Sequence, residues 1–96
     1  MSEKDANVGI LNYIVYGIIQ TPTPLDPEYV DGAFRTAIDH PNSPLSRDDF
    51  LEGIRHALES DVDLGKALPT RHDDATIRAY LRLVEARLAK ELGRSR

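Results

Sequence analysis

The feature that most constrains this chain is a run of ten residues without a charge, from position 10 to position 19, in which only Asn12 and Gly17 interrupt apolar and aromatic side chains. A helix needs about 20 apolar residues to cross a membrane, so the run is too short to span one. The residues before it carry two acids and one base, whereas a secretory signal begins with basic residues. We therefore expect a cytoplasmic protein without membrane contact.

Composition indicates that the chain folds by packing alone. Of its 96 residues, 41% are hydrophobic and 29% are charged, which are ordinary proportions for a globular protein. This length favours a single helical domain over 1–96, with frayed ends at about 1–4 and 93–96. The absence of cysteine excludes disulfides, thiolate zinc sites and thiol redox chemistry.

The uncharged run fits a helix, because no other segment has the pattern of a strand that would pair with it. At 100° per residue its aliphatic side chains fill one half of a helix, which Pro22 would end. That half holds Val8, Ile10, Leu11, Ile14, Val15, Ile18 and Ile19.

Capping signals mark the helices that follow. Asp26 precedes a proline at a first helical position, and Ser46 with Asp49 forms a capping box in which Asp replaces Glu. Thr70 or Asp73 begins the longest helix, and Gly93 suits the position after its end. We predict an all-α, compact bundle of four helices, at about 4–20, 27–39, 47–60 and 74–92, with a short helical turn near 63–68.

No motif in the sequence indicates catalysis or a cofactor. The three histidines, His40, His56 and His72, lack the spacing of zinc ligands, so we interpret them as surface residues. Acids such as Asp48 and Asp73 stand at helix starts, where the helix dipole favours them. Nucleophile motifs and glycine-rich phosphate loops are absent. We expect no enzyme, no cofactor and no bound metal.

Charge is unevenly distributed and leaves two alternatives open. Residues 1–70 carry a formal charge of −7 and residues 71–96 carry +3. Arg78 and Arg82 share a face of the last helix and could contact phosphates in a nucleic-acid-associated regulator. Nucleic acid is disfavoured because the whole chain is acidic and because basic residues near a helix end suit its dipole. An inhibitor or immunity-type protein, with an acidic N-terminal region that binds a basic partner, is the other alternative.

The other half of the first helix is uncharged and contains tyrosines, a composition typical of a protein interface. Either the other helices wrap this helix on all sides, or the uncharged half meets another chain. A domain of four short helices has few residues with which to cover a central helix on all sides. The sequence therefore favours a protein–protein interaction module that self-associates as a homodimer through this helix. The predicted interface residues are Gly9, Tyr13, Tyr16, Gly17 and Gln20.

Overall fold

The computed structural model describes residues 8–18, 21–39, 41, 45–68 and 70–95. Within these residues the chain forms helices and no strand, which confirms the predicted all-α fold. The elements are α1 (Val8–Val15), the 3₁₀ segment η2 (Tyr16–Ile18), α2 (Pro27–Ala33), the π-helical segment η3 (Phe34–Ile38), α3 (Arg47–Glu59), α4 (Leu64–Ala67) and α5 (Asp74–Ser95).

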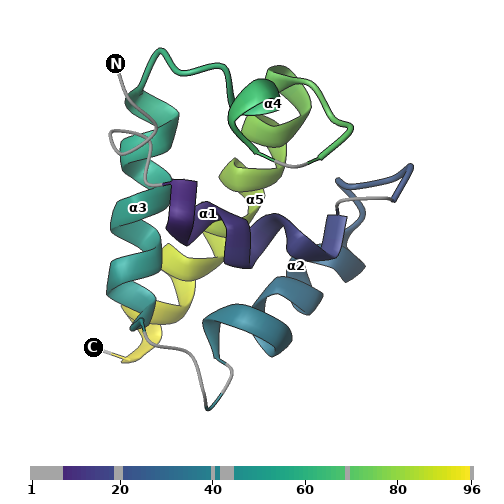
Figure 1. Ribbon diagram of the computed structural model, residues 1–96. Coiled ribbons are helices and arrows are strands. Elements are labelled where there is room, and N and C mark those ends of the chain that lie inside the picture. Colours follow the sequence, from purple (N-terminus) through teal and green to yellow (C-terminus); the bar gives the residue numbers. More distant parts are fainter. Residues whose placement is uncertain (1–7, 19–20, 40, 42–44, 69, 96) are drawn as a thin grey trace.

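Helices α3 and α5 pack against each other, and Figure 1 shows α3 along the left side of the molecule and α5 behind α1. Helix α1 starts beside α3 and crosses in front of α5, α2 lies below α1, and the short α4 packs on the first part of α5. Helix α1 therefore lies at the front of the molecule, with one face turned toward the other helices.

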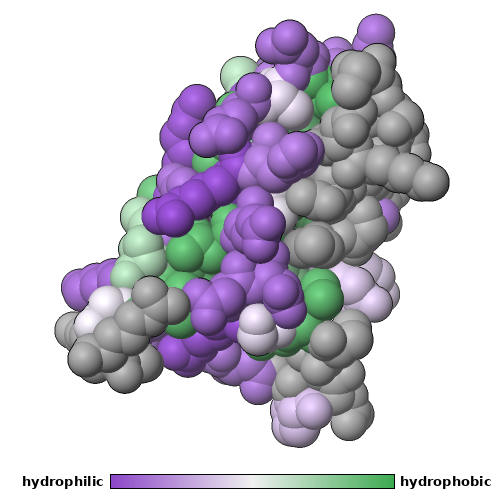
Figure 2. Space-filling view, turned by 90° about the vertical axis from the view of Figure 1, so that its left-hand side faces the viewer, coloured by the Kyte–Doolittle hydropathy of each residue, from purple (hydrophilic) through white to green (hydrophobic). Residues whose placement is uncertain are grey.

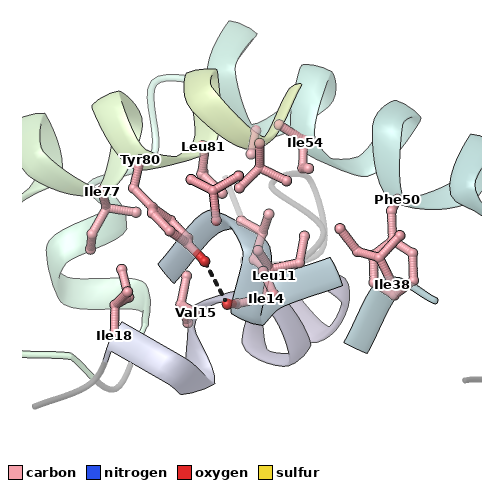
Figure 3. Close-up of a cluster of buried hydrophobic side chains, with 14 of the residues drawn as sticks. Leu11, Ile14, Val15, Ile18, Ile38, Phe50, Ile54, Ile77, Tyr80 and Leu81 are labelled. Carbon is pink, nitrogen blue, oxygen red and sulfur yellow. Dashed lines mark hydrogen bonds between the residues drawn. The ribbon is translucent and has the colours of Figure 1, made fainter. Parts of the chain in front are cut away.

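Buried apolar side chains from every helix form one core between these elements (Figure 3). Tyr80 and Phe50 are the largest of its fully buried side chains. The core also takes Leu11, Ile14, Val15 and Ile18 from the N-terminal helical segments, and Ile54, Ile77, Leu81, Val84 and Leu88 from α3 and α5.

The predicted helix starts have the expected caps. The Asp26 carboxylate accepts a hydrogen bond from the backbone N–H of Glu28 at 3.0 Å. Ser46 and Asp49 form the reciprocal capping box, with distances of 3.2 and 3.1 Å. These bonds satisfy N–H groups that have no partner inside the helix, so local sequence alone determines where α2 and α3 begin.

Two predicted helices differ in detail from the structure. The helix expected at 27–39 changes from α to π after Ala33, and the N–H of Asp39 accordingly bonds the carbonyl five residues earlier, on Phe34, at 2.8 Å. Helix α5 continues through Gly93 to Ser95, three residues past the predicted end at 92. Glycine costs an exposed helix about 1 kcal/mol relative to alanine, which a long helix tolerates. Of the helix predicted at 4–20, residues 4–7 and 19–20 lie outside the described residues.

Candidate interaction face on α1

The spacing of apolar residues in the first helix separates a buried face from an exposed one. Leu11, Ile14 and Val15 are at most 1% exposed, because they pack into the core, and Ile18 in η2 is fully buried. Tyr13 is 50% exposed and Tyr16 is 77% exposed. The helix has no acidic residue in its first turn and no basic residue in its last. Its outward face therefore consists of large, uncharged side chains in contact with solvent.

A groove lies beside these tyrosines. It has a volume of about 580 Å³ and is lined by Asn12, Tyr13, Tyr16 and Thr36. Thr36 belongs to the π-helical segment η3, and its hydroxyl donates a 2.8 Å hydrogen bond to the carbonyl of Gly32. The exposed face of α1 thus continues into a hollow whose other wall comes from η3.

Two side chains from the C-terminal part of the chain hold the end of the first helix. The Tyr80 hydroxyl donates to the carbonyl of Ile14 at 3.2 Å, as drawn in Figure 3, and lies 3.4 Å from the carbonyl of Tyr29. Burial raises the pKa of Tyr80, so its phenol stays protonated and remains a donor. His72 Nε2 lies 2.8 Å from the carbonyl of Ile18. These bonds satisfy carbonyls near the helix end and fix the tyrosine-bearing face on the core.

The structure brings part of the predicted interface together. Tyr13 and Tyr16 are exposed and line the same groove. Gly9 lies in α1 and Gly17 in η2, and Gln20 lies outside the described residues. Sequence reasoning missed Asn12 and Thr36 as lining residues. Asn12 stands out as a polar interruption of the uncharged run, but nothing in the sequence marks the π-helical turn that carries Thr36.

Arg78, considered above for phosphate contact, is instead occupied within the fold. Its Nε donates to Asp74 at 2.8 Å, and its two Nη atoms donate to the carbonyls of four residues at and beyond the end of α3. These are Ala57 at 3.4 Å, Leu58 at 3.0 Å, Ser60 at 3.0 Å and Val62 at 2.9 Å. A guanidinium has five N–H donors, so none is left for a phosphate. Arg82 lies one turn later and is exposed.

Other basic side chains are also paired. Arg87 forms an ion pair with Asp31, and its guanidinium stands 4.7 Å from the centre of the Phe34 ring. Arg55 bonds Glu85 at 3.1 Å, which joins α3 to α5. The Arg87–Asp31 pair therefore neutralises part of the positive charge of residues 71–96.

The outer side of α3 has the opposite character to the α1 face. Figure 2 shows this side of the molecule, where hydrophilic side chains predominate among the coloured residues. A shallow groove of about 410 Å³ is lined there by Asp48, Leu51, Glu52, Arg55, His56 and Glu59. Because Arg55 is paired with Glu85, the acids give this side a negative character.

Among the described residues, no group of three or more His, Cys, Asp or Glu side chains stands close enough to hold a metal ion. Among the described helices, none combines the length and apolar composition that crossing a membrane requires.

Comparison with known proteins adds no assignment. No family model matches the chain, and no curated protein or solved structure matches it. The surfaces described above are therefore the basis for the function proposed below.

Proposed function

We propose that this protein is a cytoplasmic protein–protein interaction module that self-associates through the exposed face of α1. The observation that carries the proposal is the exposure of Tyr13 and Tyr16 on a charge-free helix at the front of the molecule. Tyrosine is enriched in protein interfaces and charged residues are depleted in their centres.

The distribution of exposed apolar side chains supports this choice of surface. Among the described residues four large hydrophobic side chains are exposed, and three of them, Tyr13, Tyr16 and Leu25, lie in α1, in η2 or in the connection after it. The fourth, Leu83, lies on α5. Two of them, Tyr13 and Tyr16, line the same groove, and exposed apolar side chains that lie together are typical of a contact surface.

Charge limits where two copies of the chain can meet. The chain carries a net charge of −4, so two copies repel each other over most of their surfaces. A two-fold axis places the same patch of both copies in contact, and the uncharged α1 face is suited to this because no like charges meet there.

The acidic side of α3 supports a second candidate, an inhibitor-type protein that binds a basic partner. The two candidates differ in their dependence on salt. Binding through the α3 acids would weaken as salt screens them, whereas association through the uncharged α1 face would change little. The nucleic-acid alternative loses one of its two arginines, because the donors of Arg78 are occupied.

The proposal is tested with two matched substitutions. Tyr16→Glu puts like charges at the contact and should shift the protein to monomer in sedimentation experiments, while circular dichroism remains helical. Leu83→Glu introduces the same charge at an exposed apolar residue away from α1 and should leave the dimer intact. Equal behaviour of the two variants would contradict an interface on α1.

A further inference from the structure

The polar groups of the α1 groove are placed to receive a tyrosine hydroxyl. Asn12 is exposed, and its side-chain amide, which can both donate and accept, bonds no other described residue. The proton of the Thr36 hydroxyl is already donated to Gly32, so its oxygen can only accept. Among the described residues, two phenol rings, one amide and one hydroxyl line the groove, and none of these groups carries a charge.

The charge-free lining restricts what can occupy the groove. A charged side chain buried there would lose its hydration without gaining a partner, which is costly. A tyrosine ring suits the apolar part of the lining, and a buried tyrosine hydroxyl usually finds a hydrogen-bond partner. The groove thus fits an aromatic side chain with one polar end.

A second copy of the chain supplies that side chain at the right place. Tyr16 is the most exposed of the large hydrophobic residues described, and it stands at the edge of the same groove. In a two-fold contact, both copies insert the same side chain into the same site of the other copy. We infer that in the homodimer Tyr16 of each copy inserts into the groove of the other, where its hydroxyl bonds the amide of Asn12.

This inference rests on the proposed self-association, and it specifies the contact by which the two copies recognise each other. A polar pair buried in a mainly apolar contact favours one register, because other alignments can leave a polar group without a partner. Asn12 is therefore a specificity-determining residue of the dimer, and the rings of Tyr13 and Tyr16 provide its apolar contact area.

The test uses two conservative variants, Tyr16→Phe and Asn12→Ala. Each removes one partner from both symmetry-related bonds, so each homodimer should dissociate roughly five- to 150-fold more readily than the unaltered protein. When the variants are mixed, the heterodimer regains one complete Tyr16 to Asn12 bond, and its other site pairs Phe with Ala, which leaves no polar group unsatisfied. Native mass spectrometry should then find the heterodimer in clear excess over the statistical half.

A mixture of isotopically labelled and unlabelled unaltered protein is the control and should give the statistical half. If the two variants also mix statistically, or if Tyr16→Phe dimerises as tightly as the unaltered chain, the exchange of Tyr16 is refuted while self-association stands. An unaltered protein that is monomeric in the same experiment removes the proposed function and this inference with it.

Discussion

Arg78 joins three elements of the fold. Its guanidinium reaches from α5 to the carbonyls that end α3 and to the connection that leads into α4. The Asp74 carboxylate that it contacts also accepts the N–H of Leu64 at 2.8 Å. Because the last carbonyls of a helix have no partner inside it, one side chain here replaces several missing backbone bonds.

We predict that Arg78→Ala lowers the free energy of unfolding by about 3 kcal/mol, because it leaves four partly buried carbonyls and Asp74 without their donor. Arg78→Lys should cost less, about 1–2 kcal/mol, since lysine keeps the charge but offers its donors from one point. Urea denaturation measures both. Arg82→Ala, one turn along α5, should stay within about 0.5 kcal/mol. Similar losses at the two positions would contradict the role given to Arg78.

The sequence could not separate these two arginines. Arg78 and Arg82 are four residues apart and share one helix face, so periodicity assigns them the same environment. The difference arises from the α3–α4 connection, which brings carbonyls to Arg78 only. Tertiary contacts of this kind cannot be predicted from the spacing of residues along one helix.

A second residue-scale prediction concerns Asp39 and Arg47. Arg47 holds Asp39 by two hydrogen bonds of 2.8 and 2.9 Å, and these lower the pKa of Asp39 below its ordinary value of 3.8. The stabilisation is therefore present at neutral pH and is lost as pH falls from about 4 through the folded-state pKa. Asp39→Asn should cost at most about 1 kcal/mol at pH 7, since the pair is partly exposed. Urea denaturation at several pH values should show this difference vanish in acid; a constant difference would refute the linkage.

At the scale of elements, α4 is fitted closely against the start of α5. A Cβ atom added to Gly65 would lie 2.9 Å from the backbone nitrogen of Asp74, whereas one added to Gly32 in α2 would meet nothing within 4 Å. Glycine at position 65 is thus required by the approach of another backbone, and glycine at position 32 is not.

We predict opposite effects for the same substitution at these two glycines. Gly65→Ala should destabilise the protein by about 1–3 kcal/mol through overcrowding. Gly32→Ala should stabilise it by about 0.5–1 kcal/mol, because alanine has the higher helix propensity. Thermal unfolding followed by circular dichroism compares them, and a gain in stability at both positions would show that α4 does not pack as described.

The elements differ in how far the sequence predicts them. Caps at Asp26 and Ser46 are local signals and located the starts of α2 and α3. The turn near 63–68 was indicated by the spacing of Leu64, Ala67 and Leu68, and α4 confirms it. The change to a π-helix after Ala33 was not predictable, because the apolar spacing of this segment fits a continuous α-helix equally well. The groove wall that carries Thr36 was missed for that reason.

At the scale of the whole molecule, one face of α1 is exposed because the chain has too few helices to cover α1 on all sides. The core takes its buried side chains from all helices, and α1 still lies at the front with two tyrosines in solvent. The apolar period of the run predicted which residues of α1 face inward. It did not predict the groove, which depends on how η3 is placed beside α1.

Sedimentation equilibrium on the unaltered chain tests self-association most directly. The account predicts a mass that approaches two chains of 10.7 kDa each as the concentration rises to the order of 100 µM, and that falls toward one chain on dilution. Raising the salt concentration should not weaken association, because the contact is uncharged and salt screens the repulsion between two chains of net charge −4. A mass of 10.7 kDa at every concentration would contradict the account.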